Sequence, residues 1–331
     1  MFIIENYSTA VIFCIITMLC WGSWANTQKL AAGNWQFELF YWDYVIGILL
    51  MSLLFAFTLG SIGDGGRSFI ADVQQASKSN VGSAVLGGII FNAANILLGA
   101  AIAIAGMSVA FPVGIGLALV LGVLVNYSDN PVGNAPLLFS GVALIAAAIL
   151  LNAFAYRKAS AKSQGVSAKG LLLSVVSGIL MGFFYKYVAA SMFPEFSNPE
   201  KGKLSPYTAV LFFSVGILLS NFLFNTLLMK KPFAGKPVTY ADYFKGSGKN
   251  HLTGVLGGMI WCVGMSFSII ASGKAGTAIS YGLGQGATVV AAIWGIFIWK
   301  EFKQAPKNIS WLLYGMLLCY LAGLALIIAA R

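Results

Sequence analysis

Ten runs of about twenty or more apolar residues follow one another along the chain, separated only by short polar stretches. A helix needs about 20 apolar residues to cross the hydrocarbon core of a bilayer, and it satisfies its backbone hydrogen bonds internally. The pattern therefore predicts an all-α integral membrane protein with ten transmembrane helices. The predicted spans are 8–31, 35–60, 81–104, 107–126, 136–156, 168–191, 206–229, 252–273, 275–299 and 309–330.

The composition excludes a water-soluble fold, because 59% of the residues are hydrophobic and only 9% are charged, against about 25% charged in a soluble domain. The formal net charge of +10 comes from basic residues in short loops, which is typical of membrane proteins and predicts no nucleic-acid partner. One histidine and four cysteines without a C-x-x-C pair predict no metal site, no cofactor and no enzymatic activity.

The distribution of Lys and Arg predicts the orientation. Ten spans place both termini on one side of the membrane, and six basic residues fall in the segments on that side, against thirteen on the other. Since Lys and Arg concentrate in cytoplasmic loops, both termini are expected to be extracytoplasmic, in the cell (inner) membrane.

The chain also repeats itself. Residues 85–88 recur as 255–258, and the glycines of the following span keep the same register of about 170 residues. The predicted units are 1–160 and 161–331, with five spans each. An odd number of spans inserts the second unit upside down, which is the architecture of secondary transporters. A receptor or scaffold is the alternative from another class.

Four segments resemble one branch of the drug/metabolite transporter superfamily. They are Cys20–Trp24 (CWGSW), Phe40–Tyr44 (FYWDY), Phe55–Gly60 (FAFTLG) and Trp294–Phe302 (WGIFIWKEF). The first is similar to the first helix of L-rhamnose–proton symporters and bacterial glucose/ribose porters, and the others to plant ureide permeases. The resemblance implies a carrier with two inverted five-helix halves.

Polar residues inside the spans are the candidate site, since an unpaired polar group is costly in hydrocarbon. In the third span Gly88, Asn92, Asn95 and Gly99 share one face of a helix. The two amides at mid-depth are expected to contact a solute, and the alternative is packing between helices.

The ninth span carries a second polar stripe, made by Tyr281, Gln285 and Thr288. The repeat partners of Tyr281 and Gln285 are Phe111 and Ile115, so the polarity exists in one half only, which suits recognition of an asymmetric solute. Pro112, next to Phe111, is expected to distort the fourth span.

In the first span, Trp21 and Trp24 share a stripe with Thr17 and Gln28. A tryptophan at mid-span favours a stacking surface for a sugar or a heterocycle, although Trp24 equally suits an interfacial position. Trp261 in the eighth span is expected to form an opposing wall.

Two ionisable residues, Asp43 and Lys186, are expected to lie well inside spans. Asp43 is a candidate proton or cation carrier, with a structural salt bridge as the alternative. Lys186 is a candidate gate residue or a lysine that reaches the headgroups, and Asn26 is its repeat partner.

These features predict a secondary active transporter that works by alternating access. The expected activity is import of a small uncharged polar solute, either a monosaccharide or a ureide or nucleobase-like heterocycle. The coupling ion is expected to be H⁺, with Na⁺ as the alternative. Export of drugs or amphipathic metabolites is the second hypothesis, and it requires a cavity with few amides.

Overall fold

The computed structural model describes the chain apart from residues 32, 34, 160–166, 234, 301–302 and 304–308. Within the described residues, ten helices are long and apolar enough to cross a membrane, which confirms the predicted fold class. The spans are α1 with η1 (Tyr7–Leu30), α2 (Phe37–Phe57), α4 (Lys78–Ala105), η2 with α6 (Phe111–Asp129), α7 (Ala135–Ala159), α8 (Ala168–Ser191), α9 (Pro206–Lys230), α11 (Gly248–Ala275), α12 with α13 and η3 (Thr277–Ile298), and α14 (Ser310–Ala329).

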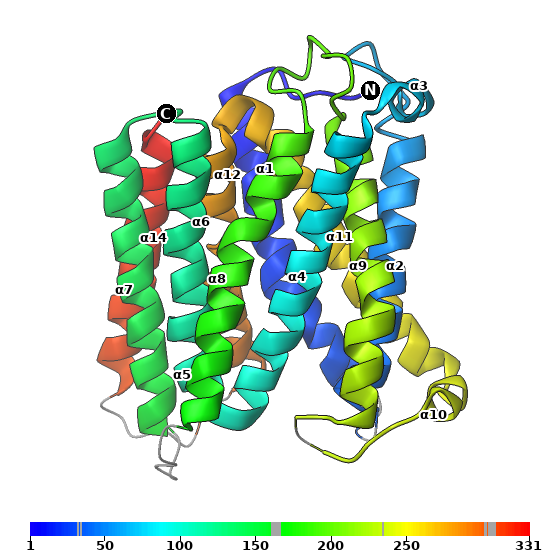
Figure 1. Cartoon of the computed structure of the whole chain (residues 1–331). Coiled ribbons are helices and arrows are strands. Elements are labelled where there is room, and N and C mark those ends of the chain that lie inside the picture. The colour runs from blue at the N-terminus through cyan, green and yellow to red at the C-terminus, as the bar shows by residue number, and fades with distance from the viewer. Residues whose placement is uncertain (32, 34, 160–166, 234, 301–302, 304–308) are drawn as a thin grey trace.

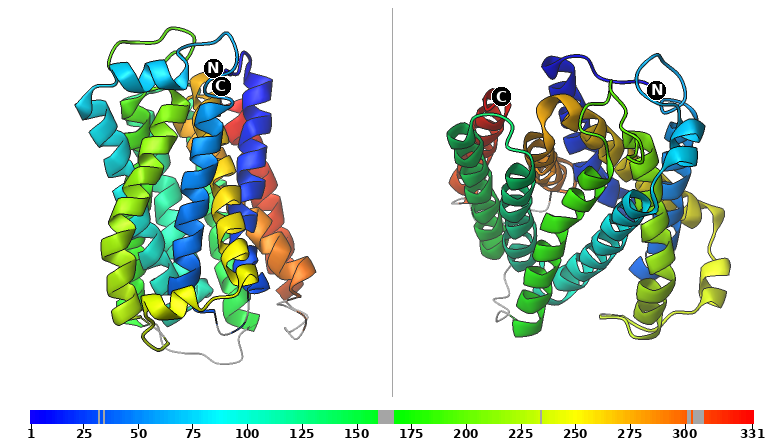
Figure 2. Two further views of the ribbon diagram at one scale, coloured as in Figure 1. Left: turned by 90° about the vertical axis from the view of Figure 1, so that its right-hand side faces the viewer. Right: turned by 45° about the horizontal axis from the view of Figure 1, so that its top comes forward.

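The spans stand side by side in one bundle (Figure 1). Both termini lie at the end of the bundle that also carries the short helix α3 (Phe69–Gln75), and α10 (Tyr240–Phe244) lies at the opposite end (Figures 1 and 2). We call these ends the terminal side and the α10 side. Their assignment to the outside and the cytoplasm rests on the distribution of basic residues and stays a prediction.

Two spans are interrupted at matching positions. The fourth begins after α5 (Met107–Ala110) with a π-helical turn, η2 (Phe111–Ile115), and continues as α6 (Gly116–Asp129). The distortion expected at Pro112 is therefore a π-helical turn, a known cause of helix bending. The ninth breaks between α12 (Thr277–Gly284) and α13 (Ala287–Ile293), before a second π-helical turn, η3 (Trp294–Ile298). Transporters commonly bind their solutes at such discontinuous helices.

Four glycines let neighbouring helices approach each other backbone to backbone. A Cβ at any of them would collide with a main-chain oxygen of the facing helix. Two contacts join α2 to α11 and two join α4 to α9, and the pairs repeat about 170 residues apart. The contacts are Gly47 with Val255, Gly258 with Tyr44, Gly216 with Val85, and Gly88 with Phe213.

Candidate solute-binding site

A cavity of about 430 Å³ lies among the spans, with its walls supplied by α1, η1, α4, η2, α8, α11 and the interrupted ninth span. This volume falls within the range of small-molecule sites. Most of the wall is apolar and aromatic, including Trp21, Trp24, Phe91, Phe184 and Trp261. Such a wall is suited to stacking against a flat ring.

Three amide side chains line this cavity, those of Gln28, Asn95 and Gln285. Asn95 donates from Nδ2 to the Tyr41 hydroxyl (3.2 Å), and in the described part of the chain its Oδ1 has no partner. Gln285 is 8% exposed and lines the cavity at the break in the ninth span, and no described residue bonds its side chain. Thr288 lines the wall beside them, with its hydroxyl donating to the Gln285 carbonyl (3.0 Å). The amides of Asn95 and Gln285 are therefore free to donate to and accept from a solute.

The two central tryptophans form one wall. Trp21 and Trp261 stack with ring centroids 5.8 Å apart and planes 14° apart, and Trp21 Nε1 donates to the Trp261 carbonyl (3.2 Å). The near-parallel rings therefore form adjoining parts of the cavity wall, and their contact with a solute stays a prediction. Trp24 lines the cavity and packs against Tyr44, with centroids 4.5 Å apart.

Two predicted site residues, Asn92 and Tyr281, lie outside the cavity wall and bind neighbouring helices. Asn92 accepts from the Tyr41 hydroxyl (2.9 Å) and donates to the Ser220 hydroxyl (2.9 Å). Tyr281 is fully buried and donates to the carbonyls of Ala118 (3.2 Å) and Met181 (3.1 Å). Both side chains hold helices together. For Asn92, this is the alternative of packing between helices that the third-span stripe left open.

Asp43 also lies outside the cavity wall, in a buried cluster near the α10 side. Its Oδ1 accepts from the Tyr243 hydroxyl (2.6 Å), and His251 Nδ1 lies 3.0 Å from each carboxylate oxygen. Burial and the Asp43 hydrogen bond raise the pKa of Tyr243 well above its usual value, so this hydroxyl stays a donor. No spacing or repeat in the sequence links Asp43 to these two residues, which follow it by about 200 positions, although His251 is the only histidine in the sequence.

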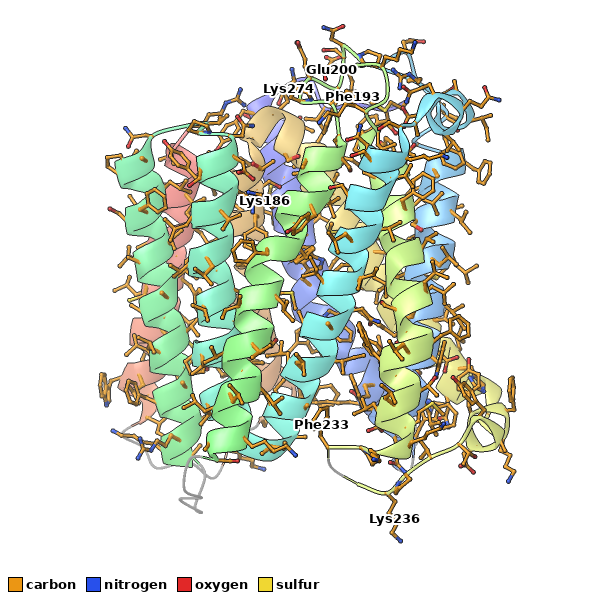
Figure 3. All side chains as sticks on the ribbon, in the orientation of Figure 1. Lys186, Phe193, Glu200, Phe233, Lys236 and Lys274 are labelled. Atoms are coloured by element: carbon orange, nitrogen blue, oxygen red, sulfur yellow. The ribbon has the colours of Figure 1, made fainter. Side chains whose placement is uncertain are left out.

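Lys186 and Asn26 bind partners at opposite ends of the bundle. Lys186 lies toward the terminal side (Figure 3) and forms an ion pair with Asp129 (2.9 Å). Asn26 Oδ1 accepts from Trp299 Nε1 (2.6 Å). Under the predicted duplication, a shift of 160 residues relates Asn26 to Lys186 and a shift of 170 relates Asp129 to Trp299, which would make the two contacts counterparts. Lys186 and Asp43 have separate partners.

The terminal side of the cavity is sealed by hydroxyl groups. The Tyr185 hydroxyl lies 3.2 Å from the Ser268 hydroxyl and donates to the Ser280 hydroxyl (3.4 Å). Thr277 donates across to the Asn126 carbonyl (3.3 Å). In the other direction, the wall continues toward the α10 side through residues near the helix ends, namely Ala25, Gln28, Phe37 and Ala103. The cavity therefore extends toward the α10 side.

Ten apolar spans around a solute-sized cavity with free amides define a multi-pass membrane permease. The sequence profile of the ureide permease family matches residues 40–169 and 157–330. The chain therefore belongs to the ureide permease family, and it is a transporter.

Two relatives align with nearly the whole length of the chain. Ureide permease 1 of Arabidopsis thaliana is 23% identical over 390 aligned positions, covering 100% of this chain and 99% of the relative. A "Putative sugar uptake protein" of Listeria innocua is 26% identical, covering 96% and 98%. A crystal structure of a 15% identical protein has a TM-score of 0.65 and covers 97% of this chain and 96% of its own. That structure supports the fold alone.

Proposed function

We propose that this chain is a proton-coupled importer of a small, uncharged, hydrogen-bonding solute. The observation that carries the proposal is the cavity of about 430 Å³ in which the amides of Asn95 and Gln285 meet an aromatic wall. An amide offers both a donor and an acceptor, which matches the N–H and C=O edge of a ureide or a nucleobase-like ring. The wall that includes Trp21 and Trp24 is suited to the flat face of such a ring.

Alternating access between two inverted repeats, 1–160 and 161–331, is the mechanism we propose. The repeated glycine contacts between α2 and α11 and between α4 and α9 support the duplication. The sealed terminal side and the cavity wall that continues toward the α10 side support one of the two end states. Transport then requires the two sides to exchange these arrangements around the bound solute.

Asp43, Lys186 and Asn26 belong to the gates in this proposal, because each binds a partner near one end of the bundle. Asp43 ties α2 to α10 and α11 through Tyr243 and His251. The proposed orientation, with the α10 side in the cytoplasm of the cell (inner) membrane, makes opening on that side the release step of import.

A monosaccharide is the second candidate solute, and the name of the Listeria relative favours it. The C–H face of a sugar also packs on tryptophan, and its hydroxyls also bond to amides. Export of amphipathic compounds is less well supported, because Asn95 and Gln285 make the wall polar at its centre.

Counterflow exchange in proteoliposomes tests the proposal. Labelled hydantoin (a cyclic ureide), uracil and glucose are offered to vesicles preloaded with the same compound. We expect accelerated exchange of at least one of them. For Gln285→Leu we expect a half-saturation concentration about tenfold higher, because the loss of one good hydrogen bond costs about 1.4 kcal/mol. Gln74→Leu, an exposed amide on α3, is the matched control.

Two outcomes contradict the proposal. One is that none of the three compounds exchanges faster than in empty vesicles. The other is that Gln285→Leu behaves as Gln74→Leu does. Coupling is tested separately, by uptake under an imposed pH gradient or an imposed Na⁺ gradient, and uptake driven by Na⁺ alone would reject the proton.

A further inference from the structure

A second cavity adjoins the solute cavity at the α10 side. It also has a volume of about 430 Å³, and it shares the lining residues Phe37, Gly99 and Ala103 with the first. The remaining wall comes from the start of α2, the end of α9 and the segment after α9. Phe233 of that segment lies beside the end of α4 (Figure 3). A solute that leaves the central cavity toward this side meets the second cavity next.

Glu38 lines this second cavity and is only 6% exposed. It lies in the first turn of α2, where the helix dipole stabilises a negative charge. Within the described residues, no cation forms an ion pair with it, and the donor that bonds to its carboxylate is its own backbone N–H. The prediction of ionisable residues named only Asp43 and Lys186, because Glu38 stands near the edge of its apolar run.

The charged groups near the second cavity lie at its rim. Lys236 is exposed, and its side chain points away from the helices (Figure 3). Lys169 Nζ lies over the Phe233 ring, 5.5 Å from its centroid. From α4 the wall receives only Gly99, Ala100 and Ala103, and from α9 only Leu228. No positive charge in the described wall therefore reaches the Glu38 carboxylate.

The main chain around Glu38 is fixed. Asn225 of α9 donates from Nδ2 to the Glu38 carbonyl (2.9 Å), and its own Oδ1 is buried without a partner in the described part of the chain. The Gln36 amide lines the same cavity, and its Oε1 faces Gly235. The first turn of α2, which carries Glu38, is thus held against α9, and a second polar side chain lies in the same wall.

Its own backbone N–H fills only part of the acceptor capacity of the Glu38 carboxylate, and a buried acceptor requires donors. An ionised carboxylate only accepts hydrogen bonds, and two parallel N–H groups fit its two oxygens. We infer that the second cavity is a separate solute site, which holds a ureido or amide solute through N–H groups that donate to Glu38. This inference rests on the proposed function, because the same solute passes from the central cavity to this one.

Calorimetric titration of the purified full-length protein with hydantoin tests the inference. We expect two binding events in the unaltered chain. Glu38→Gln should weaken one event about tenfold or more, because it removes the charge-assisted acceptor pair. Gln285→Leu should weaken the other event and leave that one in place. Glu5→Gln, an exposed glutamate near the N-terminus, is the matched control.

A solute without N–H groups sharpens the assignment. In 1,3-dimethylhydantoin both donors are replaced by methyl groups, so it should give no Glu38-dependent event. If Glu38→Gln does not fold, Glu38→Asp keeps the charge and shortens the side chain by one methylene, and it should weaken the same event only.

The inference is overturned if hydantoin binds once, with Gln285→Leu abolishing the event and the Glu38 variant leaving it unchanged. The second cavity then holds water only, and the proposed function stands. If hydantoin, uracil and glucose all fail to bind the unaltered chain, the proposed function fails together with this inference.

Discussion

Under the proposed duplication, the two ends of the central cavity correspond to each other but differ in their side-chain chemistry. On the terminal side, the hydroxyls of Tyr185 and Tyr281 bond across the helices and close the bundle. Under the proposed register, their counterparts on the α10 side are Ala25 and Phe111, which line the cavity and carry no hydroxyl. The same frame is therefore closed where the side chains can hydrogen-bond across it and open where they cannot.

This difference explains why the two end states need not have equal energy. A hydrogen bond between helices adds about 1 kcal/mol, so the Tyr281 hydroxyl, which shares its one proton between the Ala118 and Met181 carbonyls, favours closure of the terminal side by about that amount. The α10 side must close by packing of Phe111 and Ala25. A bound solute then shifts the equilibrium between these two end states only by the difference between its affinities for them.

If the two halves share one arrangement of helices, corresponding glycines should be equally intolerant of a side chain. Gly88→Ala tests this, with the largest expected effect on the free energy of unfolding. The new Cβ would collide with the Phe213 carbonyl, and we expect destabilisation by about 3 kcal/mol, as for other overpacked contacts. Gly258→Ala, the counterpart, should lose a similar amount. Thermal unfolding in detergent measures both.

Gly82→Ala is the control in the same helix as Gly88, because no atom lies within 4 Å of a Cβ built there. It should leave the midpoint unchanged or raise it slightly, since alanine favours helix over glycine. Equal midpoints for Gly82→Ala and Gly88→Ala would contradict the close approach of α4 to α9.

Tyr281→Phe tests the seal itself. Losing this one shared hydrogen bond should favour opening of the terminal side by about 1 kcal/mol, or about fivefold. Cys14 lies behind the seal, with its Sγ 3.8 Å from the Ser280 hydroxyl, so it reports opening. The measurement is its labelling rate with a membrane-impermeant maleimide, with the other cysteines replaced by alanine.

Tyr320→Phe is the matched control for Tyr281→Phe. The Tyr320 hydroxyl is also buried, but among the described residues it has no hydrogen-bond partner. Removing it should leave the labelling rate of Cys14 unchanged. If both variants label at the rate of the unaltered chain, the Tyr281 hydroxyl does not hold the terminal side closed.

Asp43→Asn tests the polar contact on the α10 side. Asparagine keeps an acceptor for Tyr243 but loses the charge next to His251. The free energy of opening α10 should therefore fall by about 1 kcal/mol, which raises the open population about fivefold. Amide hydrogen exchange of Tyr240–Phe244 measures this opening. Asp64→Asn, an exposed residue on the terminal side, should leave the exchange unchanged, and equal rates in both variants would remove Asp43 from the gate.

The sequence predicted the spans well because each one must be apolar over its full length, a property of the local sequence alone. Asn95 and Gln285 were found for a related reason, since an amide is conspicuous within an apolar run. Contacts between distant spans were harder to foresee. The stacking of Trp21 on Trp261 and the position of Asp43 against Tyr243 depend on how helices rotate about their axes, which apolar runs with weak amphipathic patterns do not determine.

Lys186 and Asn26 offer the smallest and most selective test of the two ends. The Lys186–Asp129 pair has side chains 37% and 44% exposed, so Lys186→Gln should cost only about 0.5 kcal/mol. Its counterpart, between Asn26 and Trp299, is a neutral hydrogen bond, and Asn26→Ala should cost about 1 kcal/mol.

Salt distinguishes the two contacts, because about 1 M NaCl screens an exposed ion pair but not a neutral hydrogen bond. The Lys186→Gln effect on the unfolding midpoint should therefore disappear at high salt while the Asn26→Ala effect remains. If both effects disappear, electrostatics rather than hydrogen bonding joins α1 to the ninth span, and the two contacts are not distinct in kind.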